Sequence, residues 1–450
     1  MSSRMFCGTF EAEAYWREAG LAKLPAVSDS VSAGIVETMD EMLFAFCSPG
    51  DRVLTAKPMD DAHVEYLHSI GFEFTHNRFN LSPVLEDSKS TSGGGTPPSV
   101  FDRMLDEAAY ENLVGFLPRE IQLEPFAVLP GTSAVADRFG LVGRYPAIDI
   151  VRKVNTKSYS LEMRDRLQLD NVGVVVDSVA SFHERGAQLL SRGPFLVKDE
   201  YGVSGKGNLL IESASTVESI GRYLSAQAAR GHRVRFILEP YLRKSADFSC
   251  QFQIEEDGSV EVVSVQELEN NGQAFGTSRS PRPELMENLD KQGYFRLMRG
   301  IGSLMHADGY HGDVCVDSMV LENGLAPLVE INARKSMSLI KHAVDQHLAR
   351  DGLKGCFTCV AGVREGTGDF SALLELLERE GVLYTRRNPA GVFPLTCGTM
   401  YRGSATSSPV RGRLYLAALG ETLEEQRSGL ARVGSVLSKS GVRVSQRTLQ

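Results

Sequence analysis

The chain contains 450 residues, of which 42% are hydrophobic and 23% are charged, and this balance predicts a globular protein with two or three packed units. Its net charge of −9 argues against a nucleic-acid partner, because binding a phosphate backbone requires a basic surface. The seven cysteines form no recognisable disulfide framework or zinc motif. The sequence does not open with a basic region followed by an apolar stretch, and no apolar run is long enough to cross a bilayer. We therefore expect a cytoplasmic protein with no membrane partner.

The first segments of the chain indicate a small α/β unit. Residues Arg52–Ala56 have the pattern of a strand, Asp60–Ile70 that of a helix, and Phe72–Phe79 that of a returning strand. Residues 87–99, DSKSTSGGGTPPS, carry no apolar side chain that could hold them against a core. We predict a flexible loop there.

Helices are predicted next, and the central region then changes to short strands. Helical patterns cover Phe101–Leu117, Ser133–Phe139, Ser158–Leu169 and, near the end of the chain, Leu423–Lys439. Ser215 and Glu218 have the spacing of a capping box at the start of another helix, which should end near Gly231. Apolar residues alternate over Phe248–Ile254, which predicts a half-buried antiparallel strand, and Asp257–Gly258 supplies a hairpin turn after it.

A glycine-rich segment follows a strand that ends near Lys198. Its glycines would leave backbone N–H groups open to an anion, and a serine and a lysine add further donors. The residues are Gly202, Ser204, Gly205, Lys206 and Gly207. They fit neither a Walker A loop nor a dinucleotide fingerprint. A phosphate loop and a plain hairpin turn both remain open on this pattern alone.

The segment RFILEPYL, Arg235–Leu242, is a strand that ends in an acid. Its position after a strand, a loop, a strand and a helix is typical of a nucleotide hinge. Adenine would accept from the backbone N–H of Leu242 and donate to the carbonyl of Pro240 and to Glu239. Pro240 lacks an N–H, but only its carbonyl is needed. Asp247, slightly further along, could hold the ribose hydroxyls.

The strongest pattern lies in residues 311–336, which read as two strands joined by a tight turn. Asp317 lies on the first strand. On the second, Glu330, Asn332 and Arg334 would project from one face if the strand stays regular. Two carboxylates and an amide oxygen are hard ligands suited to Mg²⁺, and Arg334 offers a planar fork for a carboxylate or phosphoryl group. An ordinary surface hairpin is the alternative, but an unpaired inward carboxylate at position 330 would be costly.

In these segments the sequence resembles the ATP-grasp superfamily. The matching motifs are PFLVK at Lys198, the loop GVSGKG, the hinge ILEPYL, and Asp317 with EINAR at residues 330–334. The segment NTKSYSLEMRDRL resembles the part that supplies the family's first nucleotide lysine, which would be Lys157 rather than Lys153. The resemblance implies an α/β (α+β) fold with three parts: a pre-grasp domain over 1–153, the ATP-grasp domain over 154–354 with a lid at about 179–240, and a C-terminal domain over 355–450.

The resemblance also implies an activity. ATP and Mg²⁺, or Mn²⁺ in its place, would be bound: Lys157, Lys198 and the glycine-rich loop would hold phosphates, and Asp317, Glu330 and Asn332 would hold the metal. Lys198 and Arg334 would act in catalysis. The enzyme would activate a carboxylic or amino acid as an acyl phosphate and join it to a peptide or other amine. A homodimer is one of the assemblies that the family allows.

The flanking segments resemble a narrower group, the peptide ligases of antibiotic assembly that include the pheganomycin peptide ligase and the butirosin acyl-transfer ligase. The chain departs from D-alanine:D-alanine ligases, which have an arginine where this chain has Cys315. Three rival interpretations stay open: a primary-metabolic ATP-grasp synthetase or carboxylase, a small-molecule kinase, and a silent nucleotide-binding protein.

Overall fold

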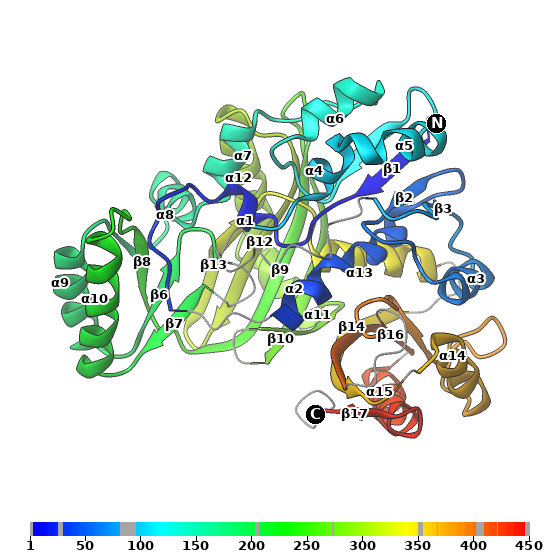
Figure 1. Ribbon diagram of the computed structural model, residues 1–450. Coiled ribbons are helices and arrows are strands. Elements are labelled where there is room, and N and C mark those ends of the chain that lie inside the picture. The colour runs from blue at the N-terminus through cyan, green and yellow to red at the C-terminus, as the bar shows by residue number, and fades with distance from the viewer. Residues whose placement is uncertain are drawn as a thin grey trace.

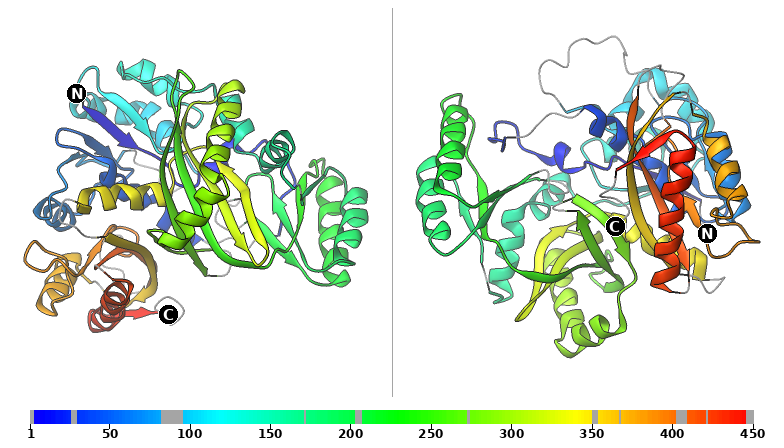
Figure 2. Two further views of the ribbon diagram at one scale, coloured as in Figure 1. Left: turned by 180° about the vertical axis from the view of Figure 1, so that it is seen from behind. Right: turned by 90° about the horizontal axis from the view of Figure 1, so that it is seen from below.

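A computed structural model (Figures 1 and 2) describes residues 3–25, 30–81, 96–170, 172–202, 207–271, 274–349, 354–366, 368–401, 409–420 and 422–445. Its strands form three sheets, one parallel and two antiparallel. Within the described residues, no helix combines the length and apolar character needed to cross a membrane. Most of the predicted loop over 87–99 lies outside this part of the chain, as do Ser204, Gly205 and Lys206.

The N-terminal part is built on a four-stranded parallel sheet in the order β3-β2-β1-β4. Its strands are β1 (Arg4–Cys7), β2 (Arg52–Leu54), β3 (Thr75–His76) and β4 (Gln122–Pro125). Its helices are α1 (Glu13–Trp16), α2 (Ser30–Glu37), the 3₁₀ helix Met39–Phe46, α3 (Asp61–Ser69), α4 (Val100–Leu105), the 3₁₀ helix Glu107–Ala109, α5 (Tyr110–Phe116), α6 (Thr132–Phe139) and α7 (Ile148–Val154). The predicted strand–helix–strand unit is confirmed as β2, α3 and β3, although β3 is only two residues long.

The prediction of a single helix over 101–117 is wrong, because the structure divides this region into three shorter helices. Asp106 has an extended backbone, with φ −66° and ψ 132°, and its carboxylate accepts the N–H of Ala108 at 3.0 Å. A capping side chain of this kind ends one helix and starts the next. Ser99 similarly caps α4 by accepting the N–H of Asp102 at 3.1 Å.

The second sheet is antiparallel, in the order β5-β8-β6-β7, and with two helices it forms what we call the lid layer. Its elements are β5 (Val174–Val176), α9 (Val179–Leu190), β6 (Phe195–Asp199), β7 (Asn208–Ile211), α10 (Ala214–Ala228) and β8 (Phe236–Pro240). The lid layer has its own apolar core. Ser213 caps α10 by accepting the N–H of Thr216 at 3.3 Å, so the cap predicted at Ser215 was placed two residues late.

The segment after α1 leaves the N-terminal sheet and runs along the lid layer (Figure 1). Ala22 and Leu24 belong to the lid core, and the N–H of Ala22 donates to the carbonyl of Arg233 at 2.8 Å. Arg17 forms an ion pair with Asp199 at the end of β6. The N-terminal part and the lid layer are therefore joined by packing as well as by the chain.

The third sheet is the largest, in the order β13-β12-β9-β10-β11-β14-β16-β15, with β17 beside β14. Its strands are β9 (Lys244–Ile254), β10 (Val260–Asn271), β11 (Ala274–Arg279), β12 (Gly312–Leu321), β13 (Gly324–Asn332), β14 (Lys354–Arg364), β15 (Val392–Pro394), β16 (Val410–Gly420) and β17 (Val442–Val444). The accompanying helices are α8 (Lys157–Arg166), α11 (Pro283–Lys291), α12 (Tyr294–Ala307), α13 (Met337–Leu348), α14 (Phe370–Arg379) and α15 (Leu423–Lys439).

The predicted alternation in β9 determines which face of this sheet is apolar. Phe248 and Phe252 are buried in the main core, and β9 packs against α12. The residues between them face the other way. Ser249 donates to Ser338 of α13 at 2.9 Å, and the side-chain amide of Gln251 lies 3.6 Å from the sulfur of Cys315. The second face is therefore polar, which suits it to line a site.

The strands after residue 354 continue the large sheet, because β14 pairs with β11. A second tie links this region to the N-terminal part. The buried carboxylate of Glu41 accepts the backbone N–H groups of Cys397 at 2.6 Å and Gly398 at 3.0 Å. The domain boundaries at 153 and 354 stay a prediction, and the second of them falls at the first residue of a strand in a continuous sheet.

Candidate active site

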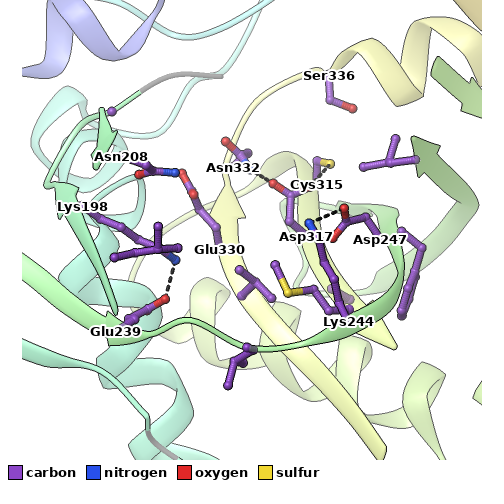
Figure 3. A pocket seen from close by; sticks show the side chains of 18 of the residues that line it. Lys198, Asn208, Glu239, Lys244, Asp247, Cys315, Asp317, Glu330, Asn332 and Ser336 are labelled. Carbon is purple, nitrogen blue, oxygen red and sulfur yellow. Dashed lines mark hydrogen bonds and ion pairs between the residues drawn. The ribbon is translucent and has the colours of Figure 1, made fainter. Parts of the chain in front are cut away.

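A cavity of about 340 Å³ lies between the lid layer and the large sheet (Figure 3). Ten of the candidate site residues predicted from the sequence line it: Lys198, Gly202, Glu239, Pro240, Leu242, Asp247, Asp317, Glu330, Asn332 and Arg334. In Figure 3, Lys198 and Glu239 lie on one side and Asp317 and Asp247 on the other, with Glu330 between them. The structure thus brings together residues that are far apart in sequence.

The hairpin of β12 and β13 positions the acidic pair. Asp317 lies directly opposite Glu330 in the ladder, and Cys315 lies opposite Asn332. The side-chain amide of Asn332 donates to Asp317 at 3.1 Å. Opposed residues of an antiparallel pair have Cβ atoms about 5 Å apart, so the two carboxyl groups share one small region.

The two carboxyl groups of this pair have different pKa values. Burial, and then the charge of Glu330, raises the pKa of Asp317 to about 7. Burial also acts to raise the pKa of Glu330, but Lys157 and Lys198 outweigh it and lower that pKa. Two carboxyl groups held this close cannot both ionise easily without a further cation.

The pair has the chemistry of a site for a hard divalent cation. Among the described residues, no group of three or more His, Cys, Asp or Glu side chains is placed to hold a metal ion. A cation here would therefore be held by Asp317, Glu330 and the amide oxygen of Asn332, with its other ligands from water or phosphate. Mg²⁺ commonly binds through one or two carboxylates in this way, so the residues present fit it.

Lys157 reaches the acidic pair from α8. Thr156 caps this helix by accepting the N–H of Tyr159 at 3.1 Å, which places Lys157 in the first turn. Its Nζ donates to Glu330 at 2.9 Å and to the carbonyl of Gly202 at 2.9 Å. The buried lysine thus connects the acidic pair with the start of the glycine-rich loop.

The glycine-rich loop is described only at its two ends. Gly202 and Gly207 lie so close that a Cβ built on Gly202 would be 2.7 Å from the Cα of Gly207. The carbonyl of Gly207 accepts the N–H of Asp199 at 2.7 Å. Side chains at these two positions would therefore push the ends of the loop apart. Gly207 itself does not line the cavity, whereas Gly202 does.

The second lysine, Lys198, is buried and forms an ion pair with Glu239. Nη1 of Arg164 lies 3.7 Å from the other oxygen of the same carboxylate. In the structure the carboxylate of Glu239 therefore contacts two cations, and its predicted contact with an adenine stays a prediction. The nearby Asp247, expected at a ribose, forms an ion pair with Lys244 at 2.5 Å.

Arg334 does not continue the regular alternation that the sequence suggested. Strand β13 ends at Asn332, and the guanidinium of Arg334 turns to Glu13 of α1. Its Nε and Nη2 lie 2.9 Å and 2.6 Å from one oxygen of Glu13. Burial acts to lower the pKa of Arg334, but Glu13 outweighs it and raises that pKa. The arginine stays at the cavity, charged and oriented by a carboxylate from the N-terminal part.

Several lining residues were not predicted from the sequence, and three of them bear on the chemistry. Glu13 lies in the segment EAEAYW, which has no recognisable motif. Arg164 lies in the quoted segment NTKSYSLEMRDRL, where its contact with Glu239 could not be read. Asn208 follows the glycine-rich loop directly. Among the residues that the structure describes, its buried side-chain oxygen has no hydrogen-bond partner, so it is available to a ligand in the cavity.

No protein-family model and no curated protein matches the sequence. Solved structures do match. N5-carboxyaminoimidazole ribonucleotide synthetase from Thermus thermophilus is 16% identical, with 96% of this chain and 98% of that chain covered and a TM-score of 0.50. The N5-carboxyaminoimidazole synthase of Aspergillus clavatus, solved with ADP and 5-aminoimidazole ribonucleotide, is 13% identical, with 97% and 99% covered and a TM-score of 0.53.

A biotin carboxylase from Campylobacter jejuni, solved as a β-γ-ATP complex, is 11% identical, with 98% of this chain and 92% of that chain covered and a TM-score of 0.52. At these low identities the likeness concerns the fold alone. The match runs over nearly the whole length of the chain. The chain therefore has the ATP-grasp fold.

Proposed function

We propose that this chain is an ATP- and Mg²⁺-dependent ligase that activates a carboxylic acid as an acyl phosphate and joins it to an amine. The observation that carries the proposal is the convergence of Asp317, Glu330, Asn332 and Lys198 at one cavity, where Lys157 donates to Glu330. Acids that suit a divalent cation and lysines that suit a triphosphate are what phosphoryl transfer needs in one place.

The two lysines would bind phosphate oxygens. Each holds a carboxylate in the described structure: Lys157 holds Glu330, and Lys198 holds Glu239. A bound triphosphate would replace those partners, which frees Glu330 to join Asp317 at the metal. A divalent cation, when bound, offsets phosphate charge as the terminal phosphoryl group moves to the acid.

Arg334 would bind the substrate carboxylate and later the oxyanion that forms when the amine attacks. Its planar fork suits either group, and Glu13 fixes its orientation before the substrate arrives. Little covalent chemistry falls to the side chains, so position and exclusion of water would supply most of the rate.

We place the reaction in specialised metabolism, with an amino acid or other small acid as one substrate and a peptide or amine as the other. This narrower proposal rests on the sequence resemblance of the flanking segments to antibiotic peptide ligases. A second candidate, a carboxylating ligase that uses bicarbonate, is favoured by the structural matches, since these are N5-carboxyaminoimidazole ribonucleotide synthetases and biotin carboxylases.

The test is an isotope experiment with the full-length protein, ATP and Mg²⁺. Candidate acids labelled with ¹⁸O in the carboxylate are paired with candidate amines, and ADP, phosphate and product are analysed. A ligase passes one ¹⁸O atom from the acid to free phosphate and yields an amide. A kinase would instead yield a stable phosphorylated product. A carboxylase would release ¹⁸O-labelled phosphate only when the label is supplied in bicarbonate.

A Glu330→Gln variant serves as the control for background hydrolysis. Release of ADP and free phosphate that carries no ¹⁸O from any acid or from bicarbonate would refute the proposed reaction.

A further inference from the structure

A second hollow, which we call the α1 cavity, lies in the N-terminal part and has a volume of about 250 Å³. Gly8 and Thr9, which follow β1, and Ala56, which follows β2, line it. It therefore lies at the carboxyl edge of the parallel sheet. Open α/β sheets bind their ligands outside the carboxyl ends of the strands, so this position favours a ligand over a packing defect.

The short helix α1 separates this cavity from the candidate active site. Glu13 lines the active-site cavity and holds Arg334, whereas the next two residues, Ala14 and Tyr15, line the α1 cavity. A molecule bound against Arg334 would therefore lie beside the second hollow, on the other side of one helical turn. This neighbourhood links the α1 cavity to the substrate rather than to a separate effector.

Small apolar side chains make up much of the α1 cavity. They include Ala14, Ala33, Val36, Ala56 and Val100. Together they leave room for apolar groups of a ligand while offering few hydrogen bonds. Burial of such groups is favourable by about 0.8 kcal/mol for each methylene in general.

The charged side chains of the α1 cavity are largely balanced from within. Glu37 forms ion pairs with Arg103 at 2.7 Å and with Lys57 at 3.1 Å. Asp40 is buried and accepts the N–H of Ala56 at 2.7 Å, and burial raises its pKa well above its usual range. The half-buried Glu11 also lines the cavity. Among the described residues, the charges that line the cavity therefore largely cancel, and they do not favour a charged group of a ligand.

The volume of the α1 cavity limits what it can hold. Pockets for whole drug-sized ligands measure about 300–1,000 Å³, and this one is smaller. It suits a single side chain of a larger molecule.

We propose that the α1 cavity is a specificity pocket that receives a compact, uncharged, apolar side chain of the substrate, such as that of leucine or valine. This inference rests on the proposed ligase function, because it assigns the pocket to a substrate of that reaction. It adds the chemical class of one substrate, which the active-site residues alone do not specify.

The first experiment compares amino acids and their amides as substrates in ADP release. Leucine or its amide should exceed glycine or its amide by at least about 10-fold in kcat/KM, as is usual for added methylenes in an apolar pocket. Ala33→Phe would fill the cavity from an exposed position of α2 and should remove this preference while leaving the KM for ATP unchanged. The matched control, Ala226→Phe, alters an exposed alanine of α10 and should retain the preference.

A second variant guards against misfolding of the first. Val36→Ala enlarges the same cavity and should shift preference from leucine towards phenylalanine. Equal loss for leucine and glycine in Ala33→Phe, or a wild-type preference for aspartate or lysine, would overturn the proposal.

A binding measurement separates this inference from the ligase proposal. Trp16, the only tryptophan, lies in α1 and donates to the carbonyl of Val128 at 2.9 Å. Titration with leucinamide and with leucine should change its fluorescence with an affinity at least about 10-fold tighter than that for glycinamide and glycine. If no pair gives ADP but leucine or its amide binds in this way, the reaction is wrong and the pocket stands. If an amide forms with transfer of ¹⁸O to phosphate and neither leucine compound shows a preference, the pocket is wrong and the reaction stands.

Discussion

The pairing of Glu13 with Arg334 gives the sharpest mutational prediction. Glu13→Gln keeps the shape of the side chain and one acceptor oxygen but removes the charge. Two nitrogen atoms of Arg334 lie 2.9 Å and 2.6 Å from that oxygen, and Glu13 is only 5% exposed. Hydrogen bonds between charged groups contribute about 1.5–3 kcal/mol, and a buried cation left without its partner costs more. We expect a loss of about 2 kcal/mol in the free energy of unfolding.

Urea unfolding followed through Trp16 measures this loss, because that residue shares α1 with Glu13 and is fully buried. With a urea slope of about 3 kcal/mol per molar, the midpoint should fall by about 0.7 M. The control is Glu18→Gln, which breaks an exposed ion pair with Arg233 and should cost less than about 1 kcal/mol. A midpoint for Glu13→Gln equal to that of the control would contradict the assigned role of the buried pair.

Three further predictions concern the active site directly. Glu330→Gln, or removal of divalent cations with EDTA, should lower ADP release at least about 100-fold with an unchanged circular dichroism spectrum; normal turnover would remove residue 330 from the metal site. Lys198→Ala should raise the KM for ATP at least about 10-fold, because it removes a buried cation that is proposed to bind the phosphates; unchanged ATP saturation would exclude that lysine from the nucleotide site. Because the folded pKa of Asp317 is raised from 3.8 to about 7, its stabilising effect is present below pH 4 and is lost as the pH rises to 7. In EDTA, the difference in unfolding midpoint between the wild type and Asp317→Asn should therefore change from pH 4 to pH 7, with the wild type becoming less stable relative to the variant. A constant difference over this range would show the assignment to be wrong.

Local patterns predicted much of the fold because each depends on neighbouring residues. Alternation in β9 and the turn at Asp257–Gly258 gave the correct hairpin, and helix α15 has the bounds expected from its amphipathic pattern. Errors arose where a side chain competed with the regular element. Asp106 interrupted a helix by capping the next one, and Ser213 capped α10 in place of Ser215.

The candidate site was predictable only in part, for a related reason. Asp317 and Glu330 could be paired from the sequence because one hairpin carries both. The partner of Arg334 could not, since Glu13 lies more than 300 residues away and no local pattern marks it. The contact of Arg164 with Glu239 likewise depends on how α8 meets β8 in space.

The continuation of the large sheet into β14 bears on attempts to shorten the protein. Removing the residues after 353 would strip Thr277, Ser278 and Arg279 of their backbone partners and would uncover a row of unsatisfied amides and carbonyls. An exposed edge strand of this kind can pair with other chains and lead to aggregation. Glu41 would be left as a buried carboxylate without the two N–H groups that it now holds. A hybrid protein that exchanges this end of the chain would therefore need a donor whose first strand can pair with β11 in the same way.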